Sequence, residues 1–139
     1  MSIINTKNLE EARKQIKKAR KPIIVKAQED NFNRKILEHG KFQILLSPET
    51  GTRKNSIKQL DSGLNHVLAK IAFKNNITIG IDLEEIKKLP KLEKAIRLSK
   101  IKQNIEICRK TRTRFAILGN KKEGLHLLLS LGASTEQTI

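Results

Sequence analysis

The fold is decided by the stretch Asp61-Ser62-Gly63-Leu64-Asn65-His66-Val67-Leu68-Ala69-Lys70, which is followed by Lys74-Asn75-Asn76-Ile77-Thr78-Ile79-Gly80-Ile81. Asp61 or Ser62 is expected to cap a helix, because short oxygen-bearing side chains satisfy the free amides at a helix start. Its buried stripe is predicted to be Leu64, Val67, Leu68, Ile71 and Ala72. Residues 77–81 form an unbroken apolar run, as in a strand that is covered on both faces. The stretch therefore predicts a helix that passes almost directly into a buried strand.

The same alternation of helix and strand extends outward in both directions. Strands are predicted at residues 23–25, 42–46 and 115–118, with a last short strand at 133–135. Helices are predicted at 8–20 with Asn8 as cap, from Asp30 or Asn31 to Gly40, over one or two turns at 83–89, at 91–111, and from Asn120 to Gly132. In the helix at 91–111 the apolar residues do not form one stripe, so we expect this helix to bend or to change its contacts midway.

Alternating strands and helices are typical of right-handed crossovers and a mainly parallel sheet. The sequence therefore predicts an α/β fold, and its 139 residues predict a single domain over 1–139. Four or five strands are expected, which is fewer than a complete eight-stranded barrel requires.

The charge of the chain indicates a polyanionic partner. Lys and Arg number 29 against 14 Asp and Glu, giving a formal net charge of +15. Such an excess favours nucleic acid. Cys108 is the only cysteine, and no apolar run is long enough to span a membrane, so we expect a cytoplasmic protein without membrane association. With four Phe and no Trp or Tyr, the chain has few rings for base stacking, so RNA is expected to be recognised through its backbone and shape.

The first candidate RNA-binding segment is the loop at residues 47–58, which follows a predicted strand. It carries Arg53, Lys54 and Lys58, and it lacks the spacing of a Walker A loop. We expect this loop to clamp an RNA backbone, although a solvated surface loop is the alternative.

The second candidate lies on the helix after Asp61. His66, Lys70 and Lys74 follow one another at four-residue spacing, and Phe73 lies beside them. A polar helix face that bears a Phe indicates a contact surface for RNA or a partner subunit. An ordinary exposed helix face is the alternative.

The third candidate is the basic cluster of Arg109, Lys110, Arg112 and Arg114. Basic residues near a helix C-terminus also complement the helix dipole, but that effect needs one or two charges rather than four. We therefore expect phosphate contacts from this cluster.

Catalytic and metal-binding patterns are poor. The histidines His39, His66 and His126 are scattered, and none belongs to a metal-binding motif. Asp82 follows a predicted strand and is expected to cap the next helix rather than to hold Mg²⁺. No catalytic residue and no metal site are predicted, so the chain is expected to perform no bond chemistry itself.

The segment at 61–81 resembles the archaeal ribonuclease P protein component 3 family, the counterpart of the eukaryotic thirty-kilodalton subunit. The resemblance rests on S-G-L-N-H-V-L-A-K at 62–70, the K-N-N turn at 74–76 and the I-T-I-G strand at 77–80, and it extends weakly over 42–132. It implies a TIM-like (β/α) barrel that is partial here, with N-terminal units missing.

The resemblance also implies a function. The chain would be a non-catalytic subunit of ribonuclease P, which removes 5′ leaders from precursor tRNA. The RNA subunit would carry the active site and its Mg²⁺, and ribonuclease P protein component 2 would be the protein partner. Precursor tRNA would be contacted indirectly. The alternatives are a general RNA-binding or ribosome-associated protein, and a small α/β enzyme that takes a phosphate-bearing substrate at the loop 47–58.

Overall fold

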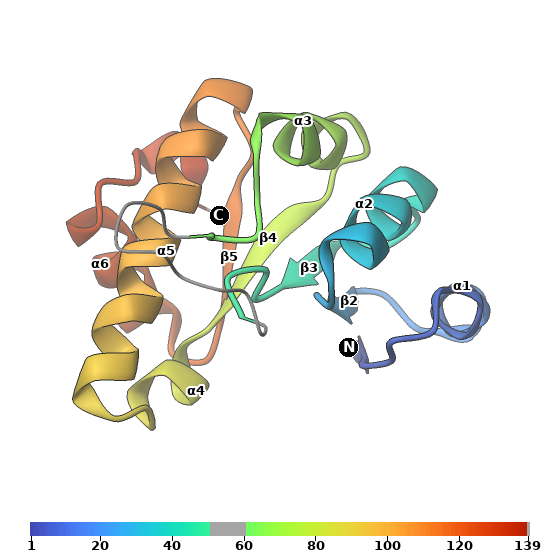
Figure 1. The fold of residues 1–139 in the computed structure, drawn as a ribbon, viewed down its shortest axis with the longest axis horizontal. Helices are drawn as coiled ribbons and strands as arrows, with labels where there is room; N and C mark the ends of the chain where they lie inside the picture. Colours follow the sequence, from blue (N-terminus) through green and yellow to red (C-terminus); the bar gives the residue numbers. More distant parts are fainter. Residues whose placement is uncertain (51–60, 139) are drawn as a thin grey trace.

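A computed structural model describes residues 1–50 and 61–138, and its centre is a five-stranded parallel sheet (Figure 1). The strands β1 (Ser2–Ile4), β2 (Ile23–Lys26), β3 (Ile44–Leu46), β4 (Thr78–Asp82) and β5 (Phe115–Leu118) lie side by side in chain order. Each pairs with the next in parallel register, for example Leu45 with Ile79 and Gly80 with Ala116. This order is that of a barrel sheet, in which every crossover leads to the neighbouring strand.

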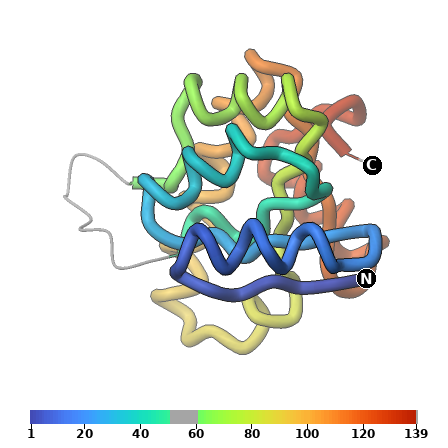
Figure 2. The backbone as a smooth tube through the Cα atoms, turned by 90° about the vertical axis from the view of Figure 1, so that its right-hand side faces the viewer, coloured from blue at the N-terminus to red at the C-terminus, as the bar shows by residue number. Residues whose placement is uncertain are grey.

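Helices connect the strands and contact one another in the same order. They are α1 (Leu9–Lys18), α2 (Asp30–His39), α3 (His66–Lys74), the short α4 (Leu83–Lys87), α5 (Lys91–Thr111) and α6 (Lys121–Ser130), followed by the 3₁₀ turn η1 (Thr135–Gln137). α1 contacts α2, α2 contacts α3, and α3 contacts α5. Figures 1 and 2 show α1, α2 and α3 succeeding one another along the sheet. The predicted α/β fold of alternating units around a parallel sheet is confirmed.

The hydrophobic core lies between the helices and one face of the sheet. Alternate strand residues such as Val25, Leu45 and Ile79 are at most 1% exposed and belong to it. Gly80 lies between two core residues and therefore faces the other side, where a Cβ would come within 2.5 Å of the Ile44 side chain. A side chain at this position would therefore require the Ile44 side chain to move, which glycine avoids.

Two local expectations around the deciding stretch are wrong. Asn65, not Asp61 or Ser62, caps α3, and its Oδ1 accepts from the Leu68 amide at 2.9 Å. Asp61 instead accepts from the amide of Gly63 at 3.0 Å. The buried residues of α3 are Leu68, Ala69 and Ala72, so Val67 faces outward and is 53% exposed rather than buried.

The long helix α5 has the predicted bounds but a different buried face. Its buried residues recur every three or four positions without a break, and they are Arg97, Lys100, Ile101, Asn104, Ile105, Cys108 and Thr111. The first half of this face is polar, and Leu92 is 73% exposed. The sequence suggested two apolar stripes on this helix. The structure has one continuous buried face instead, and charged side chains occupy its beginning.

The remaining differences lie at the chain ends and at one cap. The strand β1 was not expected from the sequence. The last strand, expected at 133–135, is absent there; η1 follows, and Thr138 forms an isolated parallel bridge with Phe115. Asn8 and Asp82 cap α1 and α4 as predicted, whereas α2 begins after Glu29, which makes no side-chain capping bond.

Candidate nucleic-acid interface

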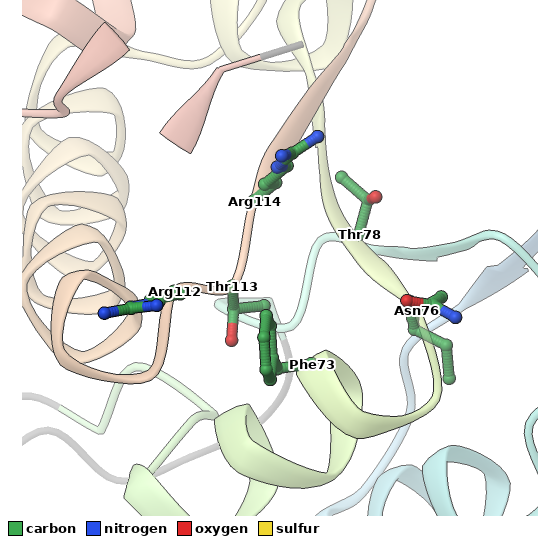
Figure 3. A pocket seen from close by; sticks show the side chains of 7 residues that line it. Phe73, Asn76, Thr78, Arg112, Thr113 and Arg114 are labelled. Carbon is green, nitrogen blue, oxygen red and sulfur yellow. The ribbon is translucent and has the colours of Figure 1, made fainter. Parts of the chain in front are cut away.

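Parts of two predicted groups meet where β4 and β5 begin, namely Phe73 from the helix face and Arg112 and Arg114 from the basic cluster. A hollow of about 280 Å³ lies there, called here the Phe73 hollow, and its lining comes from the end of α3 and from the segments before β4 and β5 (Figure 3). The lining residues are Phe73, Asn76, Ile77, Thr78, Arg112, Thr113 and Arg114. The fold thus brings a helix face and a basic turn, about forty residues apart in the sequence, to the same end of the sheet.

The basic turn is held by buried threonines. Thr111, Thr113 and Phe115 are buried, whereas Arg112 and Arg114 between them are exposed. The Thr113 hydroxyl donates to the carbonyl oxygen of Ala69 at 2.8 Å and lies 2.8 Å from the Thr111 hydroxyl. Because these bonds anchor the turn to α3, Arg112 and Arg114, which alternate with Thr111, Thr113 and Phe115, project from an anchored backbone outside the core.

Arg112 adopts a backbone conformation that its side chain disfavours. It terminates α5 in the left-handed region with φ +64°, a position that glycine usually occupies. A residue with a Cβ costs roughly 1–2 kcal/mol in this conformation. Glycine in place of Arg112 would avoid this cost at the end of α5.

The outward face of α3 combines cations with exposed apolar groups. His66, Lys70 and Lys74 are all exposed, and so are Phe73 at 51% and Val67 at 53%. The sequence prediction of a basic face that bears an exposed Phe is therefore confirmed in its geometry. Its use as an RNA contact stays a prediction.

The two remaining residues of the basic cluster differ in their surroundings. Arg109 donates to the carbonyl oxygen of Gly132 and so links the end of α5 to the end of α6. Lys110 is exposed. Arg53, Lys54 and Lys58 lie outside the described residues.

A second polar centre, not found from the sequence, lies at the opposite end of the sheet, where β3 and β4 end. Arg97 of α5 reaches back to the segment after β3 and to α4. Its Nη1 donates to Glu85 Oε1 at 2.6 Å, its Nη2 donates to the Ser47 hydroxyl at 3.4 Å, and its Nε lies 3.7 Å from Glu49 Oε1. Arg97 is 8% exposed and Glu49 is 2% exposed. The signal for this centre was present, because Arg97, Lys100 and Asn104 continue the spacing of Ile101, Ile105 and Cys108.

Burial and the charge of Arg97 shift the pKa values of Glu49 and Glu85 in opposite directions. Burial raises the pKa of Glu49, and the nearby Arg97 only partly offsets this effect. For the more accessible Glu85, burial also acts to raise the pKa, but the hydrogen bond and charge of Arg97 outweigh it and hold the pKa below its usual value. The centre therefore ties the segment after β3 to α4 and α5.

Among residues 1–50 and 61–138, no three His, Cys, Asp or Glu side chains are grouped as metal ligands. In the same part of the chain, no helix is both long and apolar enough to cross a membrane.

Comparison with known proteins identifies relatives of the chain. No family model matches it. Ribonuclease P protein component 3 of Methanococcus maripaludis strain C5 is 27% identical over 110 residues, which cover 77% of this chain and 45% of the relative. The protein of the same name from Methanococcus vannielii is 28% identical over 110 residues, with the same coverage. The chain is similar to ribonuclease P protein component 3. This finding confirms the resemblance predicted from the sequence.

A solved structure supports the fold. A chain in a cryo-EM structure of archaeal ribonuclease P with mature tRNA matches with a TM-score of 0.75 at 22% identity, over 94% of this chain and 59% of that chain. The chain thus spans less than half of the component 3 relatives, and its five parallel strands are consistent with part of a TIM-like barrel. That the missing units are N-terminal stays a prediction.

Proposed function

We propose that the chain is an RNA-binding protein subunit of an archaeal ribonuclease P, which removes 5′ leaders from precursor tRNA. The observation that carries this proposal is the similarity to ribonuclease P protein component 3 over 110 residues. The net charge of +15 and the cations around the Phe73 hollow support RNA as the ligand.

The physical role proposed for the basic side chains is the neutralisation of phosphates that RNA folding brings together. Unscreened phosphates repel one another and favour an expanded RNA, so bound cations stabilise the compact form. The RNA would carry the active site and its Mg²⁺, and the chain would lower the Mg²⁺ concentration that activity requires. The chain itself would not take part in bond cleavage.

The partners in this proposal are ribonuclease P RNA and ribonuclease P protein component 2, with precursor tRNA contacted through the RNA subunit. The complex would act in the cytoplasm. Exposed side chains on α3 that the core does not use, Phe73 among them, offer surface for RNA or protein partners.

Reconstitution of precursor-tRNA cleavage tests this function. The archaeal RNA and the remaining protein components are assembled with and without the chain, and the cleavage rate is measured across Mg²⁺ concentrations. The proposal predicts activity at lower Mg²⁺ only when the chain is present. Equal Mg²⁺ dependence with and without the chain contradicts the proposal. So does bulk ribosomal RNA that competes for binding as well as ribonuclease P RNA does. Either result favours a general RNA-binding protein. Cleavage by the isolated chain contradicts the non-catalytic role.

A further inference from the structure

We infer that the Phe73 hollow binds a single unpaired nucleotide of RNA, with its base stacked on the Phe73 ring and its flanking phosphates on Arg112 and Arg114. This inference rests on the proposed function only in taking RNA as the ligand. It differs from the sequence-based expectation, in which the chain reads RNA through its backbone and shape alone.

Phe73 is set apart from the other phenylalanines. All four lie in the described part of the chain, and Phe32, Phe42 and Phe115 are at most 7% exposed, whereas Phe73 is 51% exposed. A large apolar side chain left half in water gains little from folding. Its position in the wall of a hollow that two arginines also line is an arrangement in which aromatic rings bind unpaired bases.

The neighbouring side chains offer polar groups to the edge of a base. Asn76 and Thr78 form the wall on the β4 side of the hollow (Figure 3). An amide both donates and accepts hydrogen bonds, as does a hydroxyl, so this wall can pair with the edge of a base. Thr113 has a different role, because its hydroxyl is already bonded to Ala69.

The two arginines suit phosphates on either side of such a base. Figure 3 shows Arg112 and Arg114 pointing in different directions from the rim, Arg114 alongside Thr78 and Arg112 away from it. Two guanidinium groups that diverge cannot clamp one phosphate, but they can contact successive phosphates of a strand that enters and leaves the hollow.

A base within an RNA duplex cannot stack on Phe73, so paired RNA is excluded as the ligand of the hollow. Bases in a duplex are stacked on both faces, so a ring such as Phe73 reaches only a base that is splayed out of the helix. A protein side chain could also cover Phe73. The two arginines in the lining and the net charge of +15 favour a polyanion, and the experiment distinguishes RNA from a protein ligand.

The test measures binding of the full chain to a fluorescent single-stranded RNA of about eight nucleotides, within the site sizes of stacking proteins. The variants are Phe73→Ala, Phe73→Leu and Phe73→Tyr. Val67→Ala is the matched control, because Val67 lies on the same helix and is equally exposed. Loss of a stacked base weakens binding by roughly 5- to 150-fold, from about 1–3 kcal/mol per base. We expect this loss for Phe73→Ala and Phe73→Leu, and near-parental affinity for Phe73→Tyr and Val67→Ala.

Two comparisons separate stacking from other roles. Duplex RNA of the same length should bind all variants equally, and circular dichroism should show equal folding, because Phe73 contributes little to the core. Equal affinity of Phe73→Ala and Val67→Ala for the single strand overturns the inference and leaves Phe73 as a protein contact. Full affinity of Phe73→Leu, or an equal loss on duplex RNA, also overturns it. Parental protein that binds no RNA at all contradicts the proposed function as well.

Discussion

Replacing Arg112 by glycine is predicted to stabilise the fold and to weaken RNA binding. Arg112 has φ +64° at the end of α5. Relief of the left-handed conformation is worth about 1–2 kcal/mol, and the greater backbone freedom of glycine in the unfolded chain offsets about 0.5–1 kcal/mol. Arg112→Gly should therefore raise the free energy of unfolding by up to about 1.5 kcal/mol. Removal of one phosphate contact should reduce the slope of log affinity against log salt by about 0.7.

Urea unfolding and salt-dependent RNA binding measure the two effects on the same protein. Arg112→Ala is the control, because alanine removes the charge but keeps a Cβ in the strained conformation. It should lose the same part of the salt slope and gain no stability. A loss of stability in Arg112→Gly would show that the guanidinium supports the fold, and it would refute the reasoning that the strained conformation of Arg112 costs stability.

Three further predictions concern the core. Arg97→Met should destabilise the fold by about 3–5 kcal/mol in urea unfolding, because it leaves Glu49 buried without its counter-charge. Adding Glu49→Gln to this variant should recover part of the lost stability. No recovery would argue against the pairing of Arg97 with Glu49. Gly124→Ala should destabilise by about 1–3 kcal/mol, since its Cβ would come within 2.4 Å of Ile117, and the same change in an Ile117→Ala background should stabilise. Burial raises the pKa of Cys108 to about 12, so a thiol reagent at pH 8 should modify it only after unfolding, and rapid modification of the native protein would contradict this burial.

The fold could be predicted from the sequence because its signals are local. The apolar runs at 23–25, 77–81 and 115–118 and the caps at Asn8 and Asp82 depend on residues within a few positions of one another. β1 escaped detection because its three residues are too short a run for a periodicity to emerge. The α3 cap was misplaced because Asp61, Ser62 and Asn65 can all cap, and only tertiary packing selects Asn65.

The polar centre at Arg97 was missed for a different reason, although its residues continue the spacing of the buried face of α5. A charged residue is normally assigned to the surface, and burial of Arg97 depends on Glu49 and Glu85, which approach it only through the fold. The Phe73 hollow likewise depends on the juxtaposition of β4 and β5. The sequence indicated its two basic groups separately but not that they share one end of the sheet.

The most direct test of the central claim is the salt dependence of binding to ribonuclease P RNA. Contact with ~6 phosphates predicts that affinity falls with log salt at a slope of ~4. Arg112→Gln/Arg114→Gln should reduce this slope by about 1.4. Lys14→Gln/Lys18→Gln, which removes the same charge from exposed positions of α1 beside the opposite edge strand β1, should leave it unchanged. Equal reductions in both double variants would mean that only the net charge of the protein attracts the RNA, and they would contradict a binding surface around the Phe73 hollow.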